Sequence, residues 1–373
     1  DGQLCADAAM IMLDGRTFYK KWMQDIVDSQ CVITGHVNHT APFQGGGGGL
    51  GGWGCAMIHV PYAYYRIYDD DSLIREHFPR MLAFMRYLDS RSSAGFIVSE
   101  EKGGWNLGDW GFSKQDEFII PQNYVNTFYY IRSLEEMCEM ASLVGMDDLL
   151  PSYREKIEIS KRAMKAAYLS SQTGDFFGDY QGANCFAVEL GIGDERTYKN
   201  MYEKYNRTRE YDTGIFATDI LTGLFFKNGN AQLAYDLLTS EKPLSFGNMK
   251  NLGATTLWEY MWGDIAKTMS HNHPMFGAVT RYLFHGILGI TQREGSCGFK
   301  NIVIDPAVVR GMNSYSGYLD TVSGRIGVTV KCGETNTYYK FEIPEGVHAR
   351  FRFECNYIPL KPGINEFDMQ LIQ

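Results

Sequence analysis

The sequence predicts a mainly α-helical fold, with helices paired into hairpins around a toroid, followed by a small antiparallel β-sandwich. Two observations predict it. As far as residue 290, apolar residues recur every three or four positions, which is typical of amphipathic helices without intervening strands. After residue 300, apolar and polar residues alternate, as in half-buried antiparallel strands. We therefore expect a helical domain over 1–298 and a β-sandwich domain over 299–373.

The helical stripes follow one another along the first part of the chain. The first stripe runs from Leu4 through Phe18 to Ile26. Further helices are expected over 56–68, 72–89, 124–141, 152–169, 195–205, 215–227, 229–239 and 276–290. Gly145 and Gly174 follow helical runs, where a glycine commonly ends a helix. Recurrent pairs of such helices indicate a toroid of α-hairpins, although no repeat of fixed period is present.

The strand pattern is clearest in two segments. Residues 326–332 place Ile, Val, Val and Cys on one face, and residues 347–353 place Val, Ala, Phe and Phe on one face. The turn residues Pro344, Glu345 and Gly346 separate such runs. We assign this β-domain a packing role, because it holds almost no candidate catalytic cluster.

Composition excludes several function classes. The 373 residues carry 35 Lys and Arg against 44 Asp and Glu, a net charge of −9, which argues against a nucleic-acid partner. No apolar run is long enough to span a membrane. The eight cysteines have no CxxC spacing, so a zinc site is not expected, and they favour a reducing compartment such as the cytoplasm. No phosphate, metal or dinucleotide motif indicates a cofactor.

Two loops rich in Gly and Trp are candidate ligand sites. Trp53 follows a glycine run that starts at Gly45, and it either presents its ring to a ligand or belongs to a flexible loop. Asp109 and Trp110 follow Trp105 in a second loop. There Trp can stack on a sugar ring and Asp can accept bonds from hydroxyls. The alternative is that Asp109 satisfies loop amides beside core Trp residues.

Three further polar residues stand out. Glu259 lies between Trp258 and Tyr260 in a largely apolar segment, where a carboxylate must be paired or functional. His273 precedes a periodic helix, where a hydrogen-bonding role is favoured over metal binding. Asp7 lies near the start of the first helix, where a carboxylate is also stabilised by the helix dipole.

Together these residues suggest a glycosidase acting on a carbohydrate substrate. Glycosidases need two carboxyl groups, one to protonate the leaving group and one to activate water or attack carbon. Glu259 has a suitable setting for one of them, whereas no second carboxyl stands out in the same way.

The chain resembles glycoside hydrolase family 78, the α-L-rhamnosidases, over nearly its whole length. The resemblance rests on the runs 21–26, 52–54, 108–110, 253–259, 272–279 and 298–300 in this order, followed by the strands. It implies an (α/α)6 barrel and inverting hydrolysis of terminal α-L-rhamnosides. It also implies that Glu259 is the general base, that Trp53 and Trp110 wall the rhamnose pocket, and that His273 binds a sugar hydroxyl.

The sequence departs from the family at its N-terminal motif, Glu-Arg-x-Gly-Trp-x-Gly-Asp, whose last residue matches Asp7. The general acid of this motif would lie one position before Asp1, so we interpret the chain as a fragment. Asp1, Gln3, Leu4 and Ala6 replace the Arg, Gly, Trp and second Gly of the motif.

Alternatives therefore stay open for the acid and for the activity. The acid could instead be Asp7 or Asp109, or the chain could be a diverged, non-catalytic sugar-binding protein. Another carbohydrate enzyme built on an α-toroid, such as a polysaccharide lyase, is a further alternative. Cys55 stands where the family commonly has Asp, which leaves the sugar specificity open.

Overall fold

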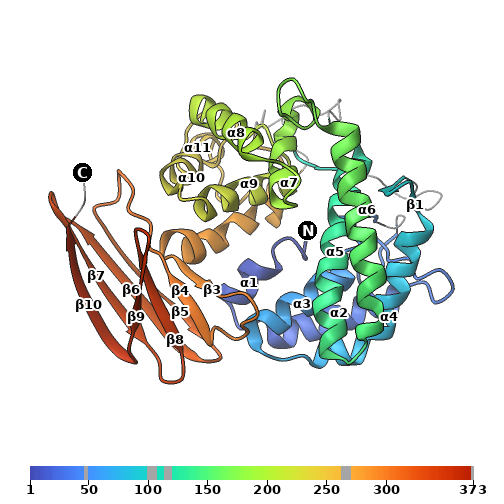
Figure 1. The fold of residues 1–373 in the computed structure, drawn as a ribbon, viewed down its shortest axis with the longest axis horizontal. Helices are drawn as coiled ribbons and strands as arrows, with labels where there is room; N and C mark the ends of the chain where they lie inside the picture. The colour runs from blue at the N-terminus through green and yellow to red at the C-terminus, as the bar shows by residue number, and fades with distance from the viewer. Residues whose placement is uncertain (46–48, 99–106, 113–119, 262–269, 371–373) are drawn as a thin grey trace.

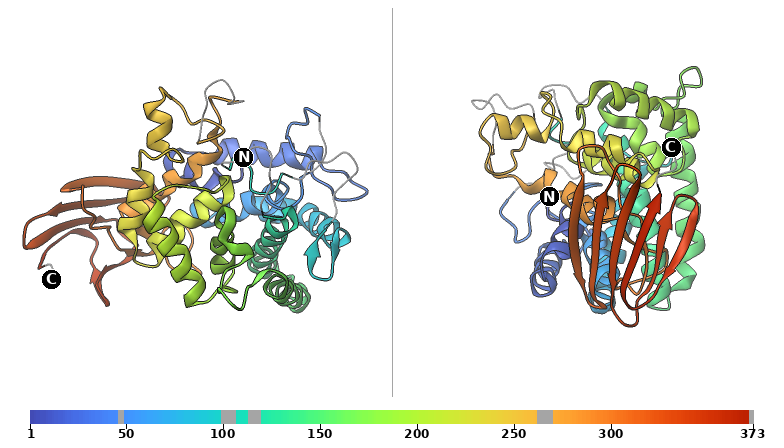
Figure 2. Two further views of the ribbon diagram at one scale, coloured as in Figure 1. Left: turned by 90° about the horizontal axis from the view of Figure 1, so that it is seen from above. Right: turned by 90° about the vertical axis from the view of Figure 1, so that its left-hand side faces the viewer.

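The computed structural model describes residues 1–45, 49–98, 107–112, 120–261 and 270–370. Helices make up one part of the molecule and strands the other, and the N-terminus lies in the middle of the helical part (Figure 1). The left view of Figure 2 shows the strands gathered at one end of the helical part, and the right view, seen from that end, shows them in front of the helices. This arrangement confirms the predicted fold class of a helical toroid followed by a β-domain.

Eleven α-helices lie in the described residues. They are α1 (Ala6–Met12), α2 (Arg16–Ser29), α3 (Ala56–Tyr68), α4 (Ser72–Ser90), α5 (Gln122–Leu143), α6 (Leu150–Tyr168), α7 (Ala183–Glu189), α8 (Glu195–Thr208), α9 (Ile215–Lys227), α10 (Ala231–Leu238) and α11 (Phe246–Asn251). Shorter helical segments are η1 (Asp147–Leu149), η2 (Phe177–Gly182), η3 (Pro274–Thr280) and η4 (Leu283–Ile287).

Helices of an inner ring alternate with helices of an outer ring along the chain. The inner helices α3, α5, α7 and α9 are buried around most of their circumference, because they contact other inner helices as well as outer helices. The outer helix α8, in contrast, buries only Thr197, Met201 and Tyr205 and exposes charged residues. The inner ring closes where α1 contacts both α3 and η3.

The first predicted stripe is divided into two helices, which corrects the expectation of one continuous helix. Leu13 adopts an extended conformation after α1, and Gly15 precedes α2. The hydroxyl of Tyr68 accepts the N–H of Gly15 at 3.0 Å, which holds the chain in this bend. Phe18, expected on the buried stripe, is 64 % exposed as a result.

Two other helical expectations differ from the structure. A short hairpin of β1 (Ser92–Ser93) and β2 (Phe96–Ile97) interrupts the helices. The stripe expected over 276–290 is η3 and η4, and its last residue, Ile290, already belongs to a strand. Both Ile and Val suit a buried helix as well as a buried strand, so periodicity alone does not place this boundary.

The β-domain consists of two four-stranded sheets. The strands are β3 (Ile290–Gln292), β4 (Asn301–Ile304), β5 (Ser314–Thr321), β6 (Gly324–Cys332), β7 (Asn336–Ile343), β8 (His348–Phe353), β9 (Asn356–Leu360) and β10 (Gly363–Gln370). One sheet has the antiparallel order β10-β7-β6-β5, and the other has the order β3-β4-β8-β9. The pair β4–β8 is parallel, because the chain passes through the other sheet before it returns.

Aromatic side chains join the two sheets. The ring of Phe351 on β8 lies 4.8 Å from Phe341 on β7 and 5.4 Å from Phe367 on β10. The alternation predicted for residues 326–332 and 347–353 is confirmed, since Ile326, Val330 and Phe351 are at most 1 % exposed. The division of the chain at residue 298 stays a prediction.

None of the helices in the described ranges combines the length and the apolar character that crossing a membrane requires. All eight cysteines are free thiols.

Candidate active site

The predicted site residues lie in segments that come just before inner helices. Trp53 precedes α3 and His273 precedes η3, while Asp109 and Trp110 contact the segment that precedes α9. The segment Asp1–Cys5 in turn leads into α1. Because the inner helices share one direction around the ring, these segments meet at the same end of the toroid.

Glu259 is a buried carboxylate at this end, with 7 % of its surface exposed. Its Oε1 accepts a hydrogen bond from the indole Nε1 of Trp110 at 3.0 Å. Its backbone N–H donates to the carbonyl oxygen of Ser270 at 3.0 Å, and the N–H of His273 donates to the carbonyl of Leu257 at 2.8 Å. These two hydrogen bonds join the backbone at 257–259 to the backbone at 270–273, and so they fix Glu259 and His273 next to each other.

His273 lies between two carboxylates. Its Nδ1 is 3.7 Å from Oε2 of Glu259, and its Nε2 is 2.8 Å from Oδ2 of Asp1. Burial lowers the pKa of His273 below its usual value, although the charge of Glu259 acts in the opposite direction. A neutral imidazole in this place has one nitrogen as donor and the other as acceptor.

The indole ring of Trp53 contacts the ring of Phe216, the second residue of α9. The two rings are 4.9 Å apart in an edge-on arrangement. A Cβ at Gly52 would lie 2.3 Å from Cζ of Phe216, so only glycine allows the chain to pass the ring here. The glycine-rich segment thus serves to bring Trp53 close to the start of α9.

Contacts link the N-terminal segment to the same end of the ring. The amino nitrogen of Asp1 donates to Oε1 of Gln3 at 3.1 Å, and Nε2 of Gln3 donates to the carbonyl of Gly52. The structure therefore brings Trp110, Glu259 and His273 together through direct contacts, whereas Trp53 contacts Phe216 and is linked to His273 only through several intervening residues. Sequence reasoning missed the contacts of Asp1 and Gln3, whose only signal was their place in the N-terminal motif.

Asp109 has partners other than the sugar hydroxyls that were expected for it. It is 1 % exposed, and its two oxygens accept the backbone N–H groups of Gly214, Phe216 and Ala217 at 2.7, 2.8 and 3.2 Å. Burial raises the pKa of Asp109 to about 7, although these amide bonds act against the rise. The structure corresponds to the alternative interpretation, in which Asp109 satisfies backbone amides, here at the start of α9.

His271 and Trp258, which lie close in sequence to His273 and Glu259, contact each other. His271 stacks on Trp258 with ring centroids 4.8 Å apart, and Trp258 is 4 % exposed. Trp105 and residues 46–48 lie outside the described residues. In the described parts of the chain, no three His, Cys, Asp or Glu side chains are grouped so as to hold a metal ion.

Asp7 lies in the first turn of α1 and belongs to a charged cluster around the ring axis. Its Oδ2 is 2.6 Å from NH1 of Arg281 and 3.5 Å from Nε2 of His59. Burial alone would raise the pKa of Asp7, but the hydrogen bond to His59 and the charges of His59 and Arg281 hold it well below its usual range. Asp7 is therefore ionised near neutral pH.

Arg281 also binds Asp219 on α9, with NH2 2.5 Å from Oδ2, so it ties α1 to α9 across the ring. Burial raises the pKa of Asp219 to about 6, against the effect of Arg281. On the other side of the cluster, Nδ1 of His59 is 2.8 Å from Oε1 of Glu136 on α5. Sequence reasoning missed Arg281, because its two partners lie on helices remote in the sequence.

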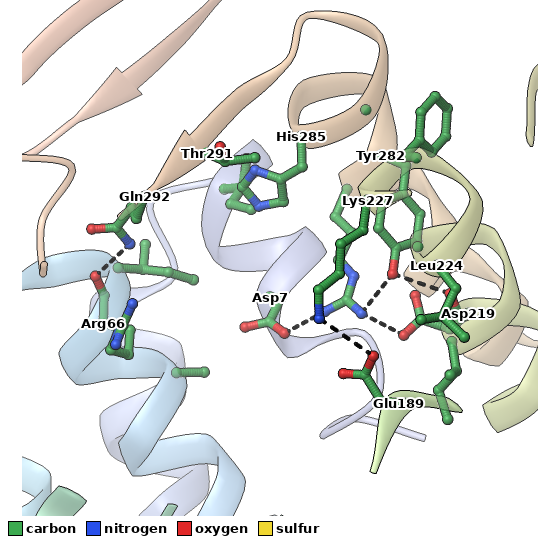
Figure 3. A pocket seen from close by; sticks show the side chains of 18 of the residues that line it. Asp7, Arg66, Glu189, Asp219, Leu224, Lys227, Tyr282, His285, Thr291 and Gln292 are labelled. Atoms are coloured by element: carbon green, nitrogen blue, oxygen red, sulfur yellow. Dashed lines mark hydrogen bonds and ion pairs between the residues drawn. The ribbon is translucent and has the colours of Figure 1, made fainter. Parts of the chain in front are cut away.

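This cluster lines a cavity of about 920 Å³ along the ring axis. Figure 3 shows Asp7, Asp219, Glu189, Lys227 and Tyr282 pointing toward one another in it. The lining includes Asp7 but none of Trp53, Trp110, Glu259 and His273. Asp7 thus borders the axial cavity, and its expected contact with substrate stays a prediction.

Comparisons with known proteins agree with this architecture. A family model described as the bacterial alpha-L-rhamnosidase 6 hairpin glycosidase domain matches residues 1–287, and the C-terminal domain of the same proteins matches residues 289–353. A relative named alpha-L-rhamnosidase from Streptomyces avermitilis is 28 % identical over 320 residues, which cover 82 % of this chain and 30 % of the relative.

Solved structures share the fold. An alpha-L-rhamnosidase from Dictyoglumus thermophilum superposes with a TM-score of 0.89 at 23 % identity, over 99 % of this chain and 45 % of that chain. A Streptomyces avermitilis alpha-L-rhamnosidase complexed with L-rhamnose has a TM-score of 0.85 at 23 % identity, over 100 % of this chain and 38 % of that chain. The chain thus spans less than half the length of these proteins.

Proposed function

The chain belongs to the bacterial α-L-rhamnosidase family, glycoside hydrolase family 78, and we propose that it hydrolyses terminal α-L-rhamnosides with inversion at the anomeric carbon. Its substrate would be a rhamnosylated glycoside or oligosaccharide. The observation that carries the proposal is the placement of Glu259, a buried carboxylate held by the indole of Trp110 and facing His273.

Glu259 is the proposed general base. Trp110 occupies Oε1, so Oε2 is the oxygen available to take a proton from water. The water attacks the anomeric carbon as the bond to the leaving-group oxygen breaks, and the leaving oxygen receives a proton from an acid on the opposite face of the sugar. Inversion requires the two carboxyl groups to lie about 6.5–9.5 Å apart, which leaves room for the water.

Neither Asp7 nor Asp109 suits the role of the acid. Asp7 is ionised and paired with Arg281, so it holds no proton to donate. Both oxygens of Asp109 accept backbone N–H groups inside the fold, which leaves neither free to face a leaving group. The proposal therefore assigns the acid to neither Asp7 nor Asp109.

Aromatic residues would form the walls of the sugar pocket. Trp53 and Trp110 provide apolar faces for the C–H groups of rhamnose, and His273 provides a hydrogen-bonding nitrogen for a hydroxyl. The polar atoms then fix the orientation of the ring, as is usual in sugar sites.

The test is hydrolysis of an aryl α-L-rhamnoside followed by proton NMR. We expect release of the aryl group, with the β-anomer of rhamnose as the first product before mutarotation. The α-anomer as first product would exclude inversion. Calorimetric binding of L-rhamnose without hydrolysis would favour a non-catalytic sugar-binding protein, and an unsaturated product absorbing in the ultraviolet would favour a lyase.

A further inference from the structure

The contact between Asp1 and His273 joins the segment before α1 to the segment before η3. The ionised carboxylate of Asp1 can only accept hydrogen bonds. Its Oδ2 lies 2.8 Å from Nε2 of His273, a distance at which a hydrogen must lie between the two atoms.

This contact determines which nitrogen of a neutral His273 carries the hydrogen. If Nε2 carries it, Nε2 donates to Asp1 and Nδ1 presents a lone pair. The other tautomer would set the Nε2 lone pair against the Asp1 carboxylate at 2.8 Å, which is repulsive. An arginine at position 1 would have the opposite effect, because it would donate to Nε2 and leave the hydrogen on Nδ1.

The surroundings hold Asp1 in place for this role. The side chain of Gln3, two residues later, donates to the carbonyl of Gly52 next to Trp53 and so holds this segment against the loop before α3. On the other side of the imidazole, Nδ1 faces Oε2 of Glu259 at 3.7 Å, which is too long for a direct hydrogen bond. An O–H group that donates to Nδ1 would therefore lie beside the proposed base.

We propose that Asp1 is a positioning residue that fixes His273 as the Nε2–H tautomer, so that Nδ1 accepts a hydrogen bond from an O–H group at the proposed sugar site. The O–H group is either a rhamnose hydroxyl or the water next to Glu259. The kinetic part of this inference rests on the proposed function, whereas the tautomer itself does not.

The charged side chains that face His273 are the carboxylates of Asp1 and Glu259. Removal of the Asp1 charge takes away one carboxylate that favours the protonated ring. The pKa of His273 should therefore be lower in Asp1→Asn than in the unchanged protein, whether or not the protein hydrolyses rhamnosides.

The first measurement is nitrogen NMR of the full chain labelled in its histidines, with His273 identified by the signal lost in His273→Gln. Above the pKa of His273, we expect Nε2 protonated and Nδ1 bare. Asp1→Asn, whose side chain can also donate, should shift the ring toward Nδ1–H, and Asp1→Glu should restore the original pattern. A protonated Nδ1 in the unchanged protein, or identical ring signals in Asp1→Asn, would overturn the proposal.

The second measurement is the kinetics of aryl rhamnoside hydrolysis. Asp1→Asn should lower kcat/KM by about tenfold or more, the effect of one misdirected hydrogen bond, while Asp1→Glu keeps most of the activity. Asp14→Asn is the matched control, since Asp14 is exposed and pairs with Arg16. Equal activity of Asp1→Asn and the control would overturn the kinetic role.

The two sources of the O–H group give different results. If a rhamnose hydroxyl donates to Nδ1, Asp1→Asn should weaken L-rhamnose binding in calorimetry and raise KM. If the water donates, kcat should fall while rhamnose binding is unchanged. If the unchanged protein hydrolyses no rhamnoside but the NMR result is as expected, the proposed function fails and the tautomer assignment stands.

Discussion

The indole Nε1 of Trp110 lies 3.0 Å from Oε1 of Glu259. This hydrogen bond joins two residues that are remote in the sequence, and it leaves Oε2 of Glu259 directed toward His273. A carboxylate held by one oxygen keeps a fixed orientation for its other oxygen. This is the preorganisation that a general base needs.

The first prediction concerns this bond. Trp110→Phe keeps an aromatic wall but removes the N–H donor, so Glu259 loses the bond that orients it. A hydrogen bond to a charged group contributes about 1.5–3 kcal/mol, so we expect kcat/KM on an aryl rhamnoside to fall about 10- to 100-fold. Trp22→Phe makes the same chemical change at an indole that donates to Ala41, and it should keep full activity. A similar rate for both variants would contradict the role of the Trp110 bond.

The second prediction concerns closure of the inner ring. Arg281→Met removes the bridge between Asp7 on α1 and Asp219 on α9 and leaves both carboxylates unpaired. Loss of one partner from such a buried network costs about 3–5 kcal/mol, which urea denaturation would measure. Arg325→Met, which breaks an exposed pair with Asp320, should leave the free energy of unfolding almost unchanged. Equal losses in the two variants would show that the bridge does not hold the ring.

The third prediction concerns stability at alkaline pH. Burial lowers the pKa of His59, but the carboxylates of Glu136 and Asp7 outweigh this effect and raise it to about 10. The usual value is 6.5, so the folded state binds more protons than the unfolded state between these two values. The stability that protonated His59 contributes is therefore present below pH 6.5 and is lost as pH rises toward 10.

Melting temperatures measured across this pH range test the assignment. The unchanged protein should lose more stability between pH 6.5 and 10 than His59→Gln, which cannot titrate. His348→Gln is the control, because His348 is exposed at the start of β8, and it should follow the unchanged protein. Parallel curves for the unchanged protein and His59→Gln would refute the raised pKa.

The fourth prediction concerns the start of α9. Asp109→Asn replaces one accepting oxygen with a donor, so at least one of the N–H groups of Gly214, Phe216 and Ala217 loses its acceptor. An unsatisfied buried group of this kind costs about 1–3 kcal/mol, which denaturation would detect. Asp194→Asn at the exposed start of α8 should have little effect, because Asn caps helices as well as Asp does. An unchanged stability of Asp109→Asn would show that these amide bonds do not matter.

Local pattern accounts for the parts of the fold that the sequence predicts well. The helix over 215–227 has the predicted bounds, because its apolar residues are nearly continuous and Gly214 and Asn228 flank it. The segment after Phe276 is harder to assign to a helix or a strand from its sequence, because its Val, Leu and Ile residues suit both. Only pairing with β4 makes Ile290 part of a sheet.

Local pattern also predicts only part of the candidate site. Glu259 stood out because a carboxylate between Trp258 and Tyr260 requires a partner. The partners of Asp109 could not be predicted, because they are backbone groups about a hundred residues later in the chain. The contact of Asp1 with His273 depends on closure of the ring between α1 and η3, which no local pattern encodes.

The most direct test of the account is the rate of aryl α-L-rhamnoside hydrolysis by Glu259→Gln. The side chain keeps its size and can still accept the bond from Trp110, but it cannot take a proton from water. We expect kcat to fall about 10²- to 10⁴-fold with the melting temperature unchanged, while Glu345→Gln in the exposed turn before β8 keeps full activity. Hydrolysis by Glu259→Gln at the rate of the unchanged protein would contradict the assignment of Glu259 as the base.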